Sequence, residues 1–336
     1  MLSKIYEKIK IFIKENYKFI LSLIAIVFLL TYELPYVVYT PGGIVNLEKR
    51  ISVKNGYDSK GSINMSYVTL RKGNIPSILL SYVIKDWDLL KESEVTGSDE
   101  SVDDLLKLEK LYMTSSIDNA TILAYKKANK KININKNINN VIYVSENAKT
   151  DISLYDIILS VDDKDINNIK ELQDYIKTKN EGDIVYFKVI SNKKEVSRKA
   201  EVININGELK VGIAFLTTYE YETDPSITVK TKSSESGSSG GLMLSLAIYN
   251  AITKEDITKG KTIVGTGTID ILGNVGKIDG VKYKILGAEK NKADLFICPM
   301  DNYDEAMKVK KEHNLDINIV SVETFDEAIN YLENNL

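Results

Sequence analysis

Residues 233–250 read SSESGSSGGLMLSLAIYN, and this stretch decides how the rest of the chain is interpreted. Five serines and three glycines lead into an apolar segment, which predicts a helix that begins near Gly241. A flexible Ser/Gly linker would not run directly into such a helix and on into several further regular elements. The composition therefore favours a structured turn that presents a serine at the start of a helix.

The region around this turn, residues 206–336, alternates strand and helix patterns and predicts an α+β domain. Cys298 falls within an apolar strand and is expected to be a small core residue. The successive elements expected after the turn read KTIVGTGTI (strand), VKYKILGAEKN (helix), DLFICP (strand), DNYDEAMKVKKEHN (helix), INIVSV (strand) and TFDEAINYLENN (helix).

One interpretation of the turn is a serine on a hydrolase elbow, because residues 237–241 fit the pattern G-x-S-x-G. That motif needs a buried strand before it, whereas the preceding ITVKTKSSE ends in polar residues. It also needs a histidine, and the chain has only His313, within the charged run KKEHNLD. A solvated helix end is the expected place for His313, which weighs against this interpretation.

A Ser-Lys dyad needs no histidine, and Ser239 with Lys284 fits it. Lys284 lies near the start of an apolar helix, in which Val281, Ile285 and Ala288 share one face. Burial lowers the pKa of an ammonium group, so such a lysine can be neutral and accept the serine proton. Ser239 precedes a helix, whose free N–H groups and dipole favour a developing oxyanion.

Composition excludes several other kinds of site. With one histidine and one cysteine, the chain cannot form an intramolecular disulfide, and a zinc site with two His or Cys ligands would need this single pair. No metal and no cofactor are expected. The charges nearly cancel, 44 basic against 47 acidic, which argues against nucleic-acid binding driven by overall charge.

The N-terminus predicts a membrane anchor. Residues 19–30 read FILSLIAIVFLL without a charge, and lysines 4, 8, 10, 14 and 18 precede them. By the positive-inside rule, residues 1–16 form a cytoplasmic tail, residues 17–34 a single transmembrane helix, and the rest lies outside the cell membrane. A cleaved signal peptide and a buried core helix are the alternatives; no A-x-A-like cleavage site follows the apolar run.

Between the anchor and residue 206 the sequence predicts an extracytoplasmic mixed region, 35–130, and a small domain, 131–205. The small domain is expected to begin with a short strand. The strand YDIILSVDD, a helix (168–179) and two further strands (183–192 and 194–206) then follow in this order. This order resembles a bacterial PDZ domain, although the usual glycines of the G-D-x-I phrase are missing. The resemblance implies that a peptide adds to a sheet edge supplied by Val141, Ile142, Tyr143 and Val144.

The region 206–336 resembles the proteolytic domain of Lon, which carries G-P-S-A-G before a helix and a lysine some 43–45 residues later. The matching segments here are residues 237–241, Thr266-Gly267-Thr268 and the DGVKYK run that ends at Lys284. The resemblance implies that Ser239 is the nucleophile, that Lys284 is the general base and that Thr266 helps to hold the lysine. Two departures, Ser238 for proline and Gly240 for alanine, leave both reactive groups in place.

The whole arrangement resembles the membrane-anchored, PDZ-containing Lon-like serine proteases of Gram-positive bacteria. It implies an ATP-independent endopeptidase that cleaves secreted or membrane-proximal peptides and proteins, with the PDZ-like domain recruiting them. A Walker A motif fails here because residue 255 is Glu255 instead of glycine. The alternative is a catalytically inactive membrane scaffold that binds peptides. The sequence identifies neither the substrate nor the cleavage site, and a homo-oligomer is suggested by analogy only.

Overall fold

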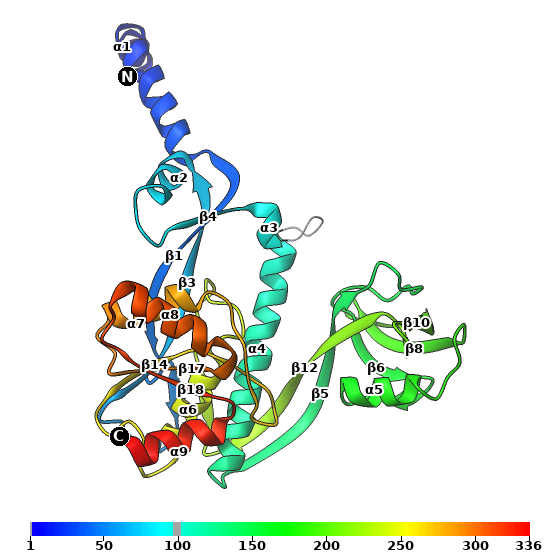
Figure 1. The fold of residues 1–336 in the computed structure, drawn as a ribbon. Coiled ribbons are helices and arrows are strands. Elements are labelled where there is room, and N and C mark those ends of the chain that lie inside the picture. The colour runs from blue at the N-terminus through cyan, green and yellow to red at the C-terminus, as the bar shows by residue number, and fades with distance from the viewer. Residues whose placement is uncertain (1, 97–101) are drawn as a thin grey trace.

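The computed structural model describes residues 2–96 and 102–336, and it shows two folded bodies joined by a long two-stranded ribbon (Figure 1). The larger body is built on a six-stranded sheet of order β18-β17-β14-β3-β1-β4. Its strands are β1 (Glu33–Asn46), β3 (Ser62–Asn74), β4 (Asp88–Lys91), β14 (Thr262–Gly265), β17 (Leu295–Pro299) and β18 (Asn318–Val322).

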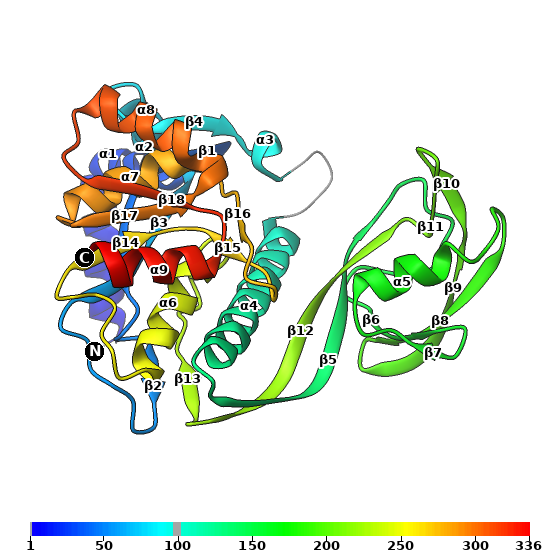
Figure 2. The ribbon, with the colours of Figure 1, turned by 60° about the horizontal axis from the view of Figure 1, so that its bottom comes forward.

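Helices cover both faces of this sheet, as Figure 2 shows. Side chains alternate along β17, so that Leu295 and Ile297 face one hydrophobic core while Phe296 and Cys298 face the other. The first core also takes side chains of α4 (Val102–Lys127), α6 (Gly241–Ile252) and α9 (Phe325–Asn335). The second takes those of α7 (Val281–Lys290) and α8 (Tyr303–His313). The predicted α+β alternation of this region is confirmed, as is the burial of Cys298.

Residues 35–130 do not form a separate region, contrary to the sequence-based division. β3 pairs in parallel with β14, with Ile63 opposite Ile263, so the early strands complete the same sheet as the late ones. The larger body thus comprises residues 33–96, 102–127 and 227–336, with the smaller body inserted between residues 127 and 227. The two strands are separated by some 200 residues of sequence, so no local sequence pattern predicts that they pair.

The smaller body contains a sheet of order β12-β5-β6-β8-β9, with β7 paired to β6. Its core gathers around Phe187 and includes Leu172 and Ile176 of the helix that covers the sheet. The predicted helix and the predicted pair of strands after it are confirmed. The elements are β5 (Lys131–Val144), β6 (Ile157–Val161), β7 (Lys164–Asp165), α5 (Ile169–Ile176), β8 (Ile184–Ser191), β9 (Lys194–Glu201), β10 (Ile203–Ile205), β11 (Glu208–Lys210) and β12 (Ile213–Asp224).

The ribbon between the bodies consists of β5 and β12, which pair along nearly their whole length and run past α4 (Figure 2). Asp118 of α4 accepts a hydrogen bond from the backbone N–H of Tyr219 at 2.9 Å, and the Ser115 hydroxyl donates to the carbonyl of Thr217 at 3.0 Å. Burial raises the pKa of Asp118 to about 6. Helix α4 is therefore the part of the larger body to which the ribbon is attached.

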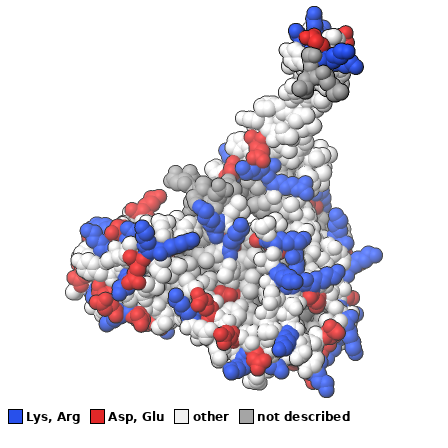
Figure 3. Space-filling model, turned by 180° about the vertical axis from the view of Figure 1, so that it is seen from behind, with Lys and Arg blue, Asp and Glu red and all other residues white. Residues whose placement is uncertain are grey.

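The N-terminal helix α1 (Leu2–Thr31) projects from the larger body, and its apolar side chains are exposed, Phe19 to 68% (Figure 1). Charged side chains gather at its free end, and the stretch nearer the body is uncharged (Figure 3). Over the part of the chain that the structure describes, no helix combines the length and the apolar character needed to cross a membrane, so the predicted transmembrane helix at residues 17–34 is not supported.

The remaining short elements complete the larger body. They are β2 (Ile51–Val53), α2 (Ile75–Ser81), α3 (Glu92–Thr96), β13 (Ile227–Val229), β15 (Thr268–Ile269), β16 (Val275–Gly276) and a 3₁₀ turn (Met300–Asn302). The strand β2 pairs with β13, and β15 pairs with β16. Thr324 caps the start of the last helix, because its hydroxyl accepts from the N–H of Glu327.

Candidate active site

The serine turn, defined here as residues 237–241, lies at the start of α6, a helix buried along almost its whole length. Gly237 has φ +92°, in the left-handed region that glycine adopts at little cost. The helix begins at Gly241 without a side-chain cap, and Ser239 is half-buried. Because α6 is fixed in the core, the position of Ser239 is fixed at the end of a rigid element.

Thr266 lies directly against this turn. Its side chain is fully buried, and its hydroxyl donates to the carbonyl oxygen of Ser239 at 2.9 Å. The N–H of Gly267 donates to the same oxygen at 2.8 Å. The resemblance implied that Thr266 holds the lysine; the hydrogen bond of its hydroxyl goes instead to the backbone of Ser239. The structure thus brings Thr266 and Ser239 together, but the Thr266 hydroxyl holds the backbone of the serine and not the side chain of the lysine.

Lys284 occupies the buried side of α7 with Val281, Ile285 and Ala288, as the sequence predicted. Its side chain is only 4% exposed, and within the described residues no group forms a hydrogen bond or ion pair with its Nζ. Burial lowers the pKa of Lys284 to about 8, and the negative charge of Asp279 works in the opposite direction. An amine with this pKa has equal charged and neutral forms near pH 8.

The helices that carry Ser239 and Lys284 begin at the same stretch of β3. A Cβ on Gly240 would lie 2.7 Å from the Met65 sulfur, and one on Gly280 would lie 3.0 Å from Val68 Cγ2. Between them, the Ser66 hydroxyl donates to the carbonyl of Gly265, the residue before Thr266. The two helices therefore start on opposite faces at one end of the sheet. No hydrogen bond joins the side chains of Ser239 and Lys284 in the part of the chain described.

Helix α4 borders the serine turn on another side, and sequence reasoning missed this. The Ser116 hydroxyl donates to the carbonyl of Ser238 at 3.1 Å, and the N–H of Gly237 donates to the carbonyl of Glu109 at 3.0 Å. Burial raises the pKa of the Glu109 carboxyl. These residues lie more than 100 positions before the turn, and no motif marks them.

The start of α6 keeps backbone donors available. The amide N–H groups of Ser239 and Gly240 have no acceptor among residues 2–96 and 102–336. Free N–H groups at the start of a helix are suited to an anion or a developing oxyanion. The turn can therefore present a hydroxyl and oxyanion donors to the same substrate carbonyl.

The hydrolase-elbow alternative does not fit. The strand before the turn, β13, has three residues, belongs to a two-stranded sheet and ends ten positions before Ser239. His313 ends α8, is 12% exposed in its side chain and has its Nε2 3.3 Å from Asp86 Oδ1. The expectation of a solvated histidine is wrong, since its side chain is largely buried and lies beside Asp86. Among the described residues, no group of three or more His, Cys, Asp or Glu is placed to hold a metal.

The predicted peptide-binding edge is not an edge. Val141, Tyr143 and Val144 of β5 pair with β12, and Ile142 lies at a register shift in that pairing. On its other side, Val141 exchanges backbone hydrogen bonds with Tyr155 and Asp156. The outermost strand is β12, which lies beside α5. Sequence reasoning chose the wrong strand because the edge strand comes after the 131–205 segment assigned to the domain.

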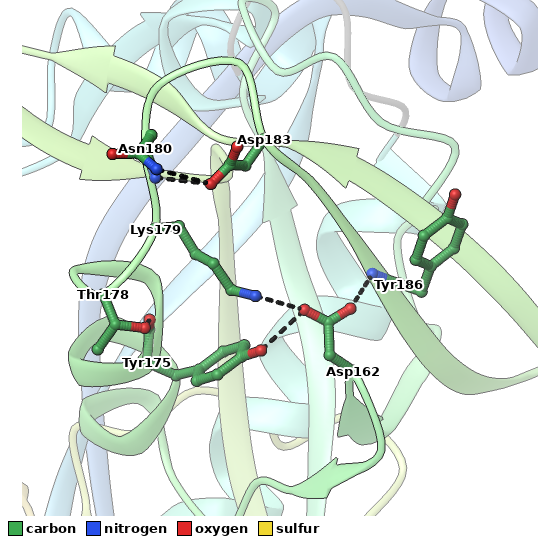
Figure 4. Close-up of polar contacts among 7 residues, drawn as sticks. All are labelled: Asp162, Tyr175, Thr178, Lys179, Asn180, Asp183 and Tyr186. Atoms are coloured by element: carbon green, nitrogen blue, oxygen red, sulfur yellow. Dashed lines mark hydrogen bonds and ion pairs between the residues drawn. The ribbon is translucent and has the colours of Figure 1, made fainter.

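A polar cluster fixes α5 beside this edge (Figure 4). Asp162 accepts from the Tyr175 hydroxyl at 2.8 Å and from Lys179 Nζ at 2.9 Å with one oxygen, and from the N–H of Tyr186 at 2.8 Å with the other. These contacts lower the pKa of Asp162 despite its burial. The C-terminal end of α5 is thereby tied to the β6–β7 turn and to β8.

Comparison with known proteins finds a family match within each body. Residues 229–334 match the family of the Lon protease (S16) C-terminal proteolytic domain, and residues 135–202 match the PDZ domain family. The Lon protease of Metamycoplasma arthritidis is 34% identical over 96 residues, which cover 29% of this chain and 11% of that protein. The Lon protease of Campylobacter jejuni is 29% identical over 96 residues, which cover 28% of this chain and 12% of that protein.

Two solved structures of PDZ domains are similar to part of this chain. The PDZ domain of the SdrC-like protein of Listeria monocytogenes is 20% identical, with a TM-score of 0.22, and the match covers 23% of this chain and 86% of that domain. The corresponding domain from Listeria innocua is 24% identical, with a TM-score of 0.22, and the match covers 23% of this chain and 92% of that domain.

The chain thus contains a Lon-type proteolytic domain and a PDZ domain, as the sequence predicted. This combination supports a serine protease that carries a PDZ domain. The match covers only about a tenth of the length of the Lon relatives, so their activity as whole proteins does not transfer directly.

Replacing Thr266 by valine should destabilise the protein. Valine keeps the volume but removes the hydroxyl that donates to the Ser239 carbonyl, which costs about 1 kcal/mol of unfolding free energy. Urea unfolding measures the difference. Thr262→Val on β14 is the matched control, because within the described chain the Thr262 hydroxyl has no hydrogen bond. Equal stability of Thr266→Val and wild type would contradict the role given to this hydroxyl.

Proposed function

We propose that this protein is an ATP-independent serine endopeptidase in which Ser239 is the nucleophile and Lys284 the general base. The observation that carries the proposal is a buried lysine that has no hydrogen-bond or ion-pair partner among the described residues. Its helix starts at the same end of the sheet as the serine turn. The match of residues 229–334 to the Lon proteolytic family supports it. The inactive scaffold, which the sequence left open, differs in predicting no acylation of Ser239.

In the proposed mechanism the Ser239 hydroxyl oxygen attacks a peptide carbonyl carbon. Lys284 accepts the hydroxyl proton, and the free N–H groups at the start of α6 stabilise the negative oxygen of the tetrahedral intermediate. The same lysine then delivers the proton to the leaving amine, which gives the acyl-enzyme. Water, deprotonated by Lys284, completes the hydrolysis.

The environment of Lys284 suits this role. A base must be unprotonated, and a pKa of about 8 leaves roughly a tenth of the amine neutral at pH 7, against less than a thousandth for an ordinary lysine. The neutral fraction rises with pH through the pKa, so activity that depends on it rises as well. Burial lowers the pKa of the Lys284 amine. It also keeps the amine out of ion pairs with carboxylates, which would favour its charged form.

The substrate class follows from the absence of an ATP motif. Glu255 stands where a Walker A motif requires glycine, which supports hydrolysis without ATP-driven unfolding. Substrates would then be peptides, flexible loops or unfolded chains, since a folded protein does not expose its backbone to the serine turn. The origin in Gram-positive bacteria and the oligomeric state stay predictions of the sequence.

Ser239→Ala and Lys284→Ala should each lower the rate of peptide hydrolysis by about 10³-fold or more. The proposed nucleophile and general base act together, so the loss of either one removes the function of both. Turnover of a fluorogenic peptide pool by the purified full chain measures this.

Lys282→Ala is the matched control for Lys284→Ala. Lys282 lies two residues away on the same helix, but its Nζ is held by Asp88 at 2.8 Å, so its loss should leave turnover near the wild-type value. His313→Ala should also remain active. Full activity of Lys284→Ala together with loss in His313→Ala would refute the dyad and favour imidazole catalysis.

The PDZ domain would recruit substrate at the outer edge of β12, beside α5. An edge strand presents unpaired N–H and C=O groups to which an extended peptide can add. Ile213, Ala214 and Leu216 of β12 are partly exposed, and the Asp162 cluster holds α5 in place beside them. This location replaces the edge first expected at residues 141–144.

A bound peptide should slow hydrogen exchange at the outward-facing amides of β12 and leave β5 unchanged, because the peptide supplies acceptors only along the open edge. Exchange measured by mass spectrometry, with and without extended peptides that have free or amidated C-termini, tests this. Protection confined to β5 or β9 would contradict the assignment.

We also propose that the exposed apolar stretch of α1, residues 19–30, attaches the chain to the cell membrane, with the folded bodies outside. The five lysines before it support this orientation. The double change Leu23→Glu and Ile26→Glu should move the protein from the membrane fraction to the soluble fraction of lysed cells. Leu154→Glu, at another exposed leucine, is the control. Retention of the double variant on membranes would refute attachment through α1.

A further inference from the structure

Helix α4 touches both the ribbon and the serine turn through two consecutive serines. Ser115 and Ser116 are each only 4% exposed. The Ser115 hydroxyl donates to the carbonyl of Thr217 on β12, and the Ser116 hydroxyl donates to the carbonyl of Ser238. Figure 2 shows α4 between α6 and the ribbon, and the two hydroxyls donate to elements on these two sides of the helix.

The Ser116 hydroxyl is closely enclosed at the turn. A Cβ on Gly241 would lie 2.6 Å from its oxygen, so a residue other than glycine at this position would displace the hydroxyl. Two turns earlier on α4, the carbonyl of Glu109 accepts the N–H of Gly237. The same helix therefore holds the backbone at two points before Ser239, the Gly237 N–H and the Ser238 carbonyl.

Two carbonyl groups flank Ser239, and each accepts two hydrogen bonds. The Ser116 hydroxyl and the N–H of Gly241 each donate to the carbonyl of Ser238 at 3.1 Å, whereas Thr266 and Gly267 donate to the carbonyl of Ser239. A peptide group is planar and trans, so its N–H points opposite to its C=O. Fixing the Ser238 carbonyl therefore fixes the direction of the Ser239 N–H, and fixing the Ser239 carbonyl fixes that of the Gly240 N–H.

We propose that Ser116 is a positioning residue for catalysis, which aims the N–H of Ser239 at the carbonyl oxygen of the substrate. This inference rests on the proposed endopeptidase function. Ser116 does not touch the reacting atoms; it acts through the Ser238 peptide group. The N–H it orients has no acceptor among the described residues and is therefore available to an oxyanion. The stabilisation grows as negative charge develops on that oxygen, which places the effect in the transition state.

The test compares Ser116→Ala with Ser115→Ala in the full chain. Both changes remove one buried hydroxyl that donates to a backbone carbonyl, from neighbouring positions of the same helix. Their effects on thermal unfolding should therefore be similar. Only Ser116→Ala should lower kcat, by about tenfold or more, with KM nearly unchanged, because it removes stabilisation made only in the transition state.

The rate at which a fluorophosphonate labels Ser239 should fall by a similar factor in Ser116→Ala alone. All rates are measured well below the unfolding midpoint of the less stable variant. Equal kcat in the two variants, or a change confined to KM, would overturn the positioning role. Ser239→Ala in the same series distinguishes failure of the proposed endopeptidase function from failure of the Ser116 proposal alone. If Ser239→Ala hydrolyses peptide as fast as wild type, the proposed function fails and the role of Ser116 fails with it.

Discussion

The parallel pairing of β3 with β14 is the constraint on which the site depends. It brings Ile63 beside Ile263 and so joins strands from the two ends of the chain in one sheet. The starts of α6 and α7 both meet β3, at Met65 and Val68, and Ser66 ties β3 to the residue before Thr266. The pairing therefore places on one strand the contacts made by the starts of the helices that follow Ser239 and carry Lys284.

The buried lysine shows how the fold sets chemistry. Burying an ammonium group without a partner is costly, and the protein reduces the cost by lowering the pKa of Lys284 to about 8. Lys282, two residues earlier, has the opposite environment, since Asp88 and Asp86 raise its pKa. One helix turn thus holds a lysine that stays charged and another that can lose its proton. The apolar face of α7, and not the lysine itself, makes this difference.

Much of this could be predicted from sequence. The helix after the serine turn, the apolar face with Lys284 and the order of elements in the PDZ domain follow from local hydrophobic patterns. The contribution of residues 33–91 to the six-stranded sheet could not be predicted, because it depends on pairing between distant segments. For the same reason Ser116 and Glu109 were missed, and the edge strand β12 was overlooked. The hydrogen bond of Thr266 depends on where two loops meet, which no spacing reveals.

The pH dependence of acylation tests the central claim most directly. A fluorophosphonate or an activated ester is mixed with the purified full chain, and mass spectrometry follows its transfer to Ser239 in a single turnover. The account predicts a rate that rises with pH and levels off with a midpoint near 8, because the neutral form of Lys284 is the base. Lys284→Ala should abolish the rise. A rate that is flat from pH 6 to pH 10, or the same profile in Lys284→Ala, would contradict the dyad.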